Sequence, residues 1–280
     1  MTIWQVDFYR RPLQDAQGHA LWELLICDEA LNFKFSAFCA QPEVNSNWLV
    51  AQFAEAASAA KRLPELVQVF RPQTLSLVEA ACDRLEIAVA PTRRTPALKQ
   101  YLKQRSQQYP QMPGYTGQPY HPTDLDQLPP QPLPANLGGE QWQFAALPAL
   151  ELEEVLLQRP IPILNAPASM LPSQLQLAKA TRVPGVVIYA GRQSLKLARW
   201  LEKQRPVFLQ AIRGELHGLV LAAGLSDRWI LVTFDDLEVT AAALEFERRK
   251  QISQGLHFLL VQPDDSGITF SGVWLLKTED

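Results

Sequence analysis

The sequence predicts a mixed α/β protein with two domains joined by a proline-rich connector. The length of 280 residues is enough for about two domains. Hydrophobic residues make up 47% of the chain and charged residues 20%, a composition that builds a core and excludes wholesale disorder. Short strand-like runs also alternate with helix-like segments on both sides of a stretch rich in proline.

Residues 1–108 form the first predicted domain. Alternating apolar and polar residues predict its strands, and capping residues or prolines predict where its helices begin. We expect strands at 3–9, 20–27, 33–40, 66–70 and 87–90, and helices at 45–63, 72–85 and 95–107. This order, β-β-β-α-β-α-β-α, resembles that of the ribonuclease-H-like fold. The resemblance is one of topology and assigns no function.

Proline marks the connector, which we place at residues 109–140. The chain has 22 prolines, which is about 8% against a usual ~5%. Many lie in this stretch, at Pro110, Pro113, Pro119, Pro122, Pro129, Pro130, Pro132 and Pro134. Proline lacks a backbone donor and keeps the preceding residue out of the helical region. We therefore expect an extended tether rather than a helix or a central strand.

Residues 141–280 predict a second mixed α/β domain. Its apolar periodicity indicates helices at 150–158, from 171 onward, at 193–203 and at 240–254. Gly255 then suits the position that follows a helix C-terminus. Strands are expected at 186–189, 207–212, 216–222, 229–234, 258–261 and 268–276.

Cysteine usage and the lack of a recognisable secretion signal predict a cytoplasmic protein. Cys27, Cys39 and Cys82 are odd in number and lack metal-ligand spacing, so we expect buried thiols rather than disulfides. The N-terminal residues lack a basic region followed by an apolar stretch. No apolar run approaches the ~18 residues of a membrane helix, so we expect no transmembrane segment. Peripheral contact with thylakoid membranes and the oligomeric state stay open.

A metal-dependent nuclease is one alternative, because two-metal cleavage of RNA needs several converging carboxylates. Asp7 lies on the first predicted strand and Glu55 on the first helix. The fourth strand, however, is followed by Arg71 instead of an acid, and a guanidinium there would repel metal ions. The chain also lacks a phosphate-binding glycine loop and a nucleophile elbow. The sequence therefore gives no positive case for an enzyme or for a cofactor.

Two acidic pairs lie in the second domain. Asp235 and Asp236 follow a predicted strand, and Asp264 and Asp265 lie in a predicted turn. A carboxylate pair at a strand end can ligate magnesium, but acidic residues also end strands and form turns without a metal. Both interpretations stay open. The four histidines have no ligand spacing, so we expect no zinc site.

The first candidate RNA-binding region is a basic and aromatic stretch. No Asp or Glu occurs from residue 87 to 123. The candidate residues are Arg93, Arg94, Lys99, Tyr101, Lys103 and Arg105, followed by Tyr109, Tyr115 and Tyr120. Cations hold a phosphate backbone and rings stack on unpaired bases, a combination typical of single-stranded RNA binding. The alternative is a solvated helix followed by a linker that carries tyrosines.

The second candidate region is a cationic helix face. Arg192, Lys196, Arg199 and Lys203 recur at steps of four, three and four, which places them on one side of a helix. Such a ridge can contact phosphates, although amphipathic surface helices are commonly built this way. Two basic regions on separate domains would add avidity if both contacted one strand.

Several dispersed segments resemble the Tab2/Atab2 family. The start of that family is similar to Trp4-Gln5-Val6-Asp7-Phe8, Arg11-Pro12 and Leu21-Trp22-Glu23-Leu24-Leu25-Ile26-Cys27-Asp28. Its C-terminal signature is similar to Val183-Pro184-Gly185-Val186, Gly255-Leu256-His257-Phe258-Leu259 and Gly272-Val273-Trp274-Leu275-Leu276. Val273 departs from the aromatic residue of many relatives. The resemblance spans nearly the whole chain.

The resemblance implies an RNA-binding protein of cyanobacteria and chloroplasts. Chloroplast members bind A/U-rich 5′ untranslated RNA and promote translation of photosystem I reaction-centre subunits, with roles extending to photosystem II. The family element associated with function corresponds to Trp274, Leu275 and Leu276. No RNA-contact residues are carried over from the family, so both basic regions are predictions from this sequence.

We therefore expect a non-enzymatic protein that binds single-stranded mRNA in its 5′ untranslated region. The translation machinery and photosystem subunits are further expected partners. Besides the nuclease, the alternative is an assembly factor that contacts proteins through an apolar surface near Trp274. Trp274 itself either fills the core of the second domain or presents its indole to a base.

Overall fold

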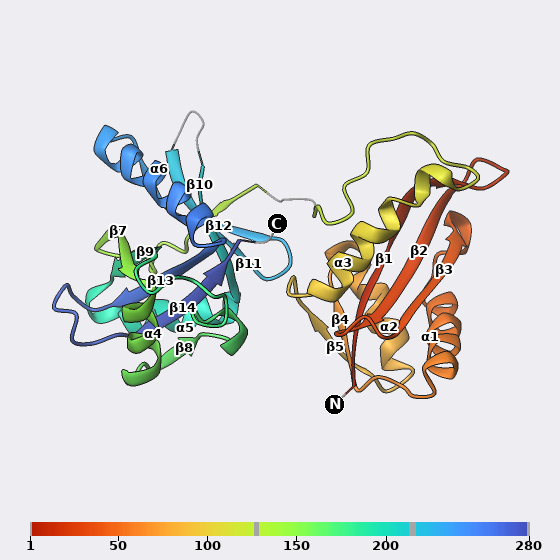
Figure 1. Cartoon of the computed structure of the whole chain (residues 1–280), viewed down its shortest axis with the longest axis horizontal. Helices are drawn as coiled ribbons and strands as arrows, with labels where there is room; N and C mark the ends of the chain where they lie inside the picture. The colour runs from red at the N-terminus through yellow and green to blue at the C-terminus, as the bar shows by residue number, and fades with distance from the viewer. Residues whose placement is uncertain (1, 126–128, 213–216, 279–280) are drawn as a thin grey trace. The chain divides into compact units, whose positions relative to one another are not determined.

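The computed structural model describes residues 2–125, 129–212 and 217–278. The chain divides into two compact units, Met1–Asp126 (unit 1) and Gln127–Asp280 (unit 2) (Figure 1). Within the described residues there are three β-sheets and six α-helices. The predicted mixed α/β class is therefore confirmed.

Unit 1 is a five-stranded sheet with helices on both faces. Its strand order is β3-β2-β1-β4-β5, in which β1, β2 and β3 are antiparallel and β4 and β5 run parallel to β1. The elements are β1 (Ile3–Gln14), β2 (Ala20–Asp28), β3 (Lys34–Ala40), α1 (Ser46–Ala60), β4 (Leu66–Val69), α2 (Leu75–Asp83), β5 (Ala88–Pro91) and α3 (Pro96–Ser106). The predicted order of strands and helices is found, while membership of the ribonuclease-H-like fold stays a prediction.

The two faces of this sheet bury different residues because side chains alternate along a strand. Val6 and Phe8 of β1 belong to the core that includes Phe53 of α1. On the opposite face, Leu25 of β2 packs with Leu98 of α3. Helix α3 crosses in front of β1 and β2 in Figure 1. Residues at odd positions of β1 therefore lie on the α3 side of the sheet.

The stretch that we predicted as an extended connector, residues 109–140, differs from the prediction. Its first part packs on unit 1. Leu13 forms an isolated antiparallel β-bridge with Tyr115, and the backbone N–H of Gln14 donates to the Gly114 carbonyl at 2.8 Å. Its last part belongs to unit 2, where Leu137 is buried in the core. Proline prevents a regular helix there but leaves carbonyls and rings free to pack, which the composition of the stretch did not indicate.

Unit 2 contains a four-stranded sheet, β10-β11-β12-β6, and a five-stranded sheet, β7-β9-β13-β14-β8. In the second sheet, β9 and β13 are parallel, and β13 and β14 are antiparallel. The elements are β6 (Gln131–Pro132), β7 (Gln141–Pro148), α4 (Ala149–Gln158), β8 (Ile163–Asn165), β9 (Arg182–Tyr189), α5 (Ser194–Gln204), β10 (Pro206–Ile212), β11 (His217–Ala223), β12 (Asp227–Phe234), α6 (Leu237–Ile252), β13 (Leu256–Gln262) and β14 (Gly272–Lys277).

The prediction for unit 2 is wrong at residues 171 and 268, and it omits the strands β6, β7 and β8. The expected helix from residue 171 is absent in this described part: Ala168–Met170 is a 3₁₀ turn, and turns follow it. The last strand begins at Gly272 rather than at 268. Strand β7 was not predicted. Its residues are partly buried on both faces, so the alternation that indicates a strand is weak.

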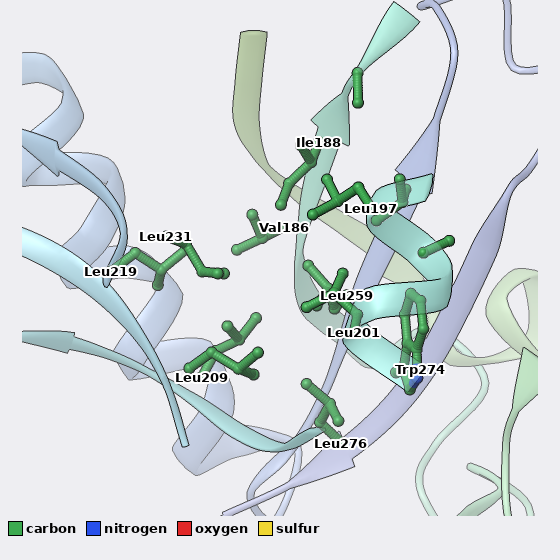
Figure 2. Close-up of a cluster of buried hydrophobic side chains, with 14 of the residues drawn as sticks. Val186, Ile188, Leu197, Leu201, Leu209, Leu219, Leu231, Leu259, Trp274 and Leu276 are labelled. Atoms are coloured by element: carbon green, nitrogen blue, oxygen red, sulfur yellow. The ribbon is translucent and has the colours of Figure 1, made fainter. Parts of the chain in front are cut away.

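Helix α5 and strand β14 meet in the largest core cluster of unit 2. Figure 2 shows Leu197 and Leu201 of α5 near Leu259 of β13 and Trp274 of β14. Glycine is required at position 272, because an added Cβ would collide with the indole of Trp274. This packing fixes which side of α5 faces the core and which side faces solvent.

Candidate nucleic-acid interface

The solvent face of α5 carries three cations on one stripe. At 100° per residue, Lys196, Arg199 and Lys203 lie within roughly 60° of the helix circumference. Leu197 and Leu201 occupy the buried side. Arg192 precedes α5 in a 3₁₀ turn, Gly191–Gln193, and is exposed. We call Arg192, Lys196, Arg199 and Lys203 the α5 ridge.

These four cations are available to a ligand. All are exposed, and in the described part of the chain none of them forms an ion pair. Glu202, the acid in α5, lies on the flank of the helix between the ridge and the core. The ridge therefore presents positive charge that no carboxylate of a described residue neutralises by an ion pair.

A groove of about 510 Å³ runs beside the α5 ridge. Helix α5 lines it with Lys196, Arg199 and Lys203 and with the apolar side chains of Leu195 and Trp200, and Leu137 lines it from outside the helix. The ring of Trp200 is half-buried and packs edge-on against Trp229, with ring centroids 5.1 Å apart. The groove thus combines a fixed aromatic ring with cations spaced along one side, which suits a base next to a phosphate backbone.

The α3 region does not form a comparable ridge. Arg105 is bound internally, because its Nε donates to Glu23 Oε1 at 2.6 Å. The ammonium of Lys99 lies 5.2 Å from the centroid of the Phe70 ring. Burial raises the pKa of Tyr101, which also hydrogen-bonds Ser36. Much of this predicted set therefore holds unit 1 together.

The remaining α3 candidates are more accessible to solvent. Lys103 and Arg94 are exposed and Arg93 is half-buried. The tyrosines that follow divide in the same way: Tyr109 is buried, whereas Tyr115 is 39% exposed. RNA contact by this region stays a prediction, with Lys103 and Arg94 as its most exposed cations.

Asp7 is the residue on which the nuclease alternative depends, and two arginines bind it. Arg11 Nη2 donates to Asp7 Oδ2 at 2.8 Å, and Arg71 Nε pairs with Asp7 Oδ1 at 2.8 Å. Burial by itself lowers the pKa of Arg11, but the charge of Asp7 and its other neighbours raises it overall. Glu55 lies on α1, which packs on the opposite face of the sheet from Asp7. The two carboxylates therefore do not converge.

Glu23 completes a buried polar cluster behind Asp7. Arg11 Nε donates to Glu23 Oε2 at 3.1 Å, and Tyr109 Oη donates to the same oxygen at 2.6 Å. Burial raises the pKa of Tyr109, so its hydroxyl stays protonated and donates. Arg71 also binds the segment after α3. Its Nη1 donates a hydrogen bond to the Asp124 carbonyl at 2.9 Å, and its Nη2 donates to the Pro122 carbonyl at 2.6 Å. This cluster fastens residues 109–124 to the sheet.

One member of each acidic pair in unit 2 has a structural role. Asp236 caps α6, accepting from the backbone N–H groups of Glu238 and Val239 at 2.7 and 3.1 Å. Asp264 accepts from Ser266 in its turn, which lowers the pKa of that carboxyl. Among the described residues, no group of three or more His, Cys, Asp or Glu side chains is arranged to hold a metal ion.

The three thiols are buried and free. Burial raises the pKa of Cys27 and of Cys82 to about 12, and that of Cys39 to about 11. Such thiols stay protonated near neutral pH and behave as small apolar groups. Across the residues that the structure describes, no helix is both long and apolar enough to span a bilayer.

Comparison with known proteins identifies the family. Residues 3–105 match the family model "RNA-binding protein Tab2/Atab2 N terminal", and residues 120–277 match "RNA-binding protein Tab2/Atab2, C-terminal domain". The chain belongs to the Tab2/Atab2 family. The resemblance predicted from the sequence is thereby confirmed.

Two plant members of the Tab2/Atab2 family align with almost the whole chain. The TAB2 homolog, chloroplastic, of Zea mays is 31% identical over 281 residues, covering 98% of this chain and 70% of its own length. The one from Arabidopsis thaliana is 29% identical over 277 residues, covering 98% and 74%. The HTLV-2 integrase catalytic core domain with magnesium, in its dimeric form, is 16% identical and covers 40% of this chain and 75% of its own. Its TM-score of 0.28 carries no argument about fold or activity.

The Tab2/Atab2 signature at the C-terminus is core rather than surface. Trp274 and Leu276 are each 1% exposed and lie in the cluster under α5. Leu275 points to the other face of β14 and packs with Phe258. Trp274 therefore fills the core and does not present its indole to a base, and it offers no surface to a protein partner. Within the signature, Trp274 and Leu276 pack in the same core cluster as the buried side of α5.

Sequence reasoning missed part of the groove in this Tab2/Atab2 protein. Trp200 lies four residues after Lys196, so a helical wheel places it beside the cations, and that spacing was the available signal. Leu137 carried no such signal, because it comes from the stretch predicted as a tether. The groove exists because that stretch folds back against α5.

Proposed function

We propose that the protein binds single-stranded RNA in the groove beside α5. The observation that carries this proposal is that Lys196, Arg199 and Lys203 line the groove together with Trp200, which lies beside them on the same helix. Phosphates contact the cations, with release of condensed counterions, while a base packs against the indole. Membership of a family of RNA-binding proteins supports the same assignment.

The biological role that we propose is support of photosystem I subunit synthesis, with photosystem II as an extension. The protein would bind A/U-rich 5′ untranslated mRNA and recruit the translation machinery, without chemistry of its own. The chloroplast TAB2 homologs among its relatives support this role. We propose a cytoplasmic location with peripheral contact to thylakoids, where such subunits are inserted.

Fluorescence anisotropy with labelled A/U-rich RNA tests the groove. The variant Lys196→Gln/Arg199→Gln removes two charges from the ridge, and Arg62→Gln/Lys179→Gln removes two exposed charges elsewhere. We expect at least about tenfold weaker binding for the ridge variant, because each phosphate contact is charge-assisted. The control pair should stay within about twofold of wild type. Equal losses in both variants would contradict the assignment.

Ribosome profiling tests the biological role. In cells that lack the protein, we expect lower ribosome occupancy on photosystem I reaction-centre transcripts at unchanged transcript levels. Complementation with the ridge variant Lys196→Gln/Arg199→Gln should fail to restore occupancy. Normal occupancy in the deletion strain would refute the translational role while leaving RNA binding itself intact.

A further inference from the structure

A second pocket lies on unit 1, between the C-terminal half of β1 and residues 116–124. Its volume is about 310 Å³, at the lower end of the range for small-molecule sites. The side chains that the argument uses are Tyr9, Arg10, Gln14, Arg71, Gln118 and Tyr120. The pocket lies on a different unit from the α5 groove, and the function proposed above does not use it.

The walls of this pocket are held in place. The guanidinium of Arg71 lies 4.2 Å from the centroid of the Tyr9 ring, and its N–H groups are fixed by Asp7 and by backbone carbonyls. Tyr120 accepts a hydrogen bond from Arg11 Nη1 at 2.6 Å. The half-buried ring of Tyr9, which the buried guanidinium of Arg71 supports, and the ring of Tyr120 therefore stand ready without rearrangement, which lowers the entropic cost of binding a planar ligand.

The charge at the pocket favours an anion at its rim. Among the residues described as lining it, three are arginines and Asp124 is the single acid. Asp7 and Glu23 already neutralise the two buried arginines, Arg11 and Arg71. Arg10 is exposed and contacts the ring of its neighbour Tyr9 at 6.0 Å, so its guanidinium is the one open to an incoming phosphate.

Amide side chains supply the remaining chemistry. Gln14 and Gln118 both line the pocket and are exposed, and each carries a donor and an acceptor side by side. That pair of groups matches the polar edge of a nucleobase. We propose that the pocket binds one ribonucleotide, with its base against the ring of Tyr9, its edge at the two glutamines and its phosphate on Arg10.

The nucleotide has two sources with the same chemistry: a unit of an RNA strand, or a free nucleoside monophosphate. The first source rests on the RNA binding proposed above, and the second does not. The experiment uses the full chain and titrates AMP, UMP, inorganic phosphate and an A/U-rich 12-nucleotide RNA by calorimetry. The variants are Arg10→Gln and Gln118→Ala, with Arg62→Gln as an exposed control on the same unit.

Support takes either of two forms. Binding of AMP or UMP that falls at least about tenfold in Arg10→Gln and in Gln118→Ala, but not in Arg62→Gln, supports a site for free nucleotides. A loss of that size for the 12-nucleotide RNA alone supports a site for one unit of a strand. For AMP and UMP, Lys196→Gln/Arg199→Gln should leave the affinity at the wild-type value, because neither residue lines this pocket.

Two results overturn the pocket proposal. One is that Arg10→Gln and Gln118→Ala bind every probe as wild type does. The other is that inorganic phosphate binds as tightly as AMP, which would leave no role for the base. If the RNA does not bind at all while AMP does, the proposed function fails and the pocket stands. If RNA binding depends on the α5 ridge and no probe depends on Arg10 or Gln118, the reverse holds.

Discussion

Asp7 shows at the scale of one residue how neighbours decide the chemistry of a carboxylate. It lies on the first strand, where the sequence allowed a metal ligand, but Arg11 and Arg71 bind both of its oxygens. The sequence indicated the pairing of Asp7 with Arg71, because Arg71 follows β4 at the position where a nuclease would need an acidic residue. Arg11 was the unrecognised partner, four residues along the same strand. The carboxylate thus fastens the arginines that support the unit 1 pocket.

Replacing Asp7 by Asn is predicted to destabilise the protein rather than to remove an RNA-cleaving activity. Arg71 would lose its carboxylate partner and Arg11 would keep only Glu23, which costs about 3–5 kcal/mol. Urea unfolding followed by circular dichroism measures the change. Glu55→Gln, an exposed carboxylate on α1, is the control and should stay within about 0.5 kcal/mol of wild type. Magnesium-dependent RNA cleavage that Asp7→Asn abolishes would contradict this prediction.

His257 makes stability depend on pH. Its Nε2 accepts from Leu209 N–H at 2.8 Å, and its Nδ1 donates to the Gly255 carbonyl at 2.8 Å. Burial, together with the charge of Lys250, lowers its pKa to about 3, so the folded protein holds it neutral. Because the unfolded chain protonates near pH 6.5, the stabilisation is full above that pH and is lost between pH 6.5 and 3.

The predicted loss is roughly 1 kcal/mol of unfolding free energy for each pH unit across that window. Denaturant titrations at several pH values measure it. His257→Gln removes the titrating group, so its stability should fall less steeply with acidification than that of wild type. Parallel pH profiles for the two proteins would show that this histidine is not the responsible group.

Single elements were predictable where one face is buried and the other is solvated. Helix α5 follows this pattern, so its position and its cationic face both came from periodicity. Residues 109–124 could not be predicted in the same way. Their attachment depends on Tyr109, Tyr120 and arginines from distant strands, and no local pattern reports contacts between residues so far apart in sequence.

The aromatic wall of the groove is tested by Trp200→Leu, which keeps an apolar side chain against the core. We expect RNA affinity to fall by about 1–3 kcal/mol, the usual contribution of one base stacked on an aromatic ring. The dependence of affinity on salt should not change, because no charge is removed. Anisotropy titrations at three salt concentrations separate these effects. Unaltered affinity would place the bases elsewhere.

The docking of residues 109–124 is tested at two glycines with positive φ. Gly114 has φ +79°, and an added Cβ would collide with the Gln14 carbonyl oxygen, whereas Gly117 has φ +71° and faces open space. Gly117→Ala should cost about 1–2 kcal/mol from backbone strain alone. Gly114→Ala should cost clearly more and speed hydrogen exchange in residues 109–124. Equal losses would mean that this contact does not hold the segment.

At the scale of the whole molecule, net charge does not explain RNA binding. The formal net charge is −3. Attraction to RNA must therefore come from local arrangements such as the α5 ridge. The mixed α/β class and the family were predictable because they are carried by many dispersed residues. The groove was only half predictable, since one wall is a periodic helix and the other is Leu137 from a stretch without a pattern.

The salt dependence of RNA affinity tests the central claim most directly. Each cation that contacts a phosphate contributes about 0.7 to the slope of log K against log salt concentration for a single strand. Lys196→Gln/Arg199→Gln should reduce the slope by about 1.4, while Arg62→Gln/Lys179→Gln leaves it at the wild-type value. If the ridge variant keeps the wild-type slope, its cations do not contact the RNA, and the α5 groove is not the RNA-binding site.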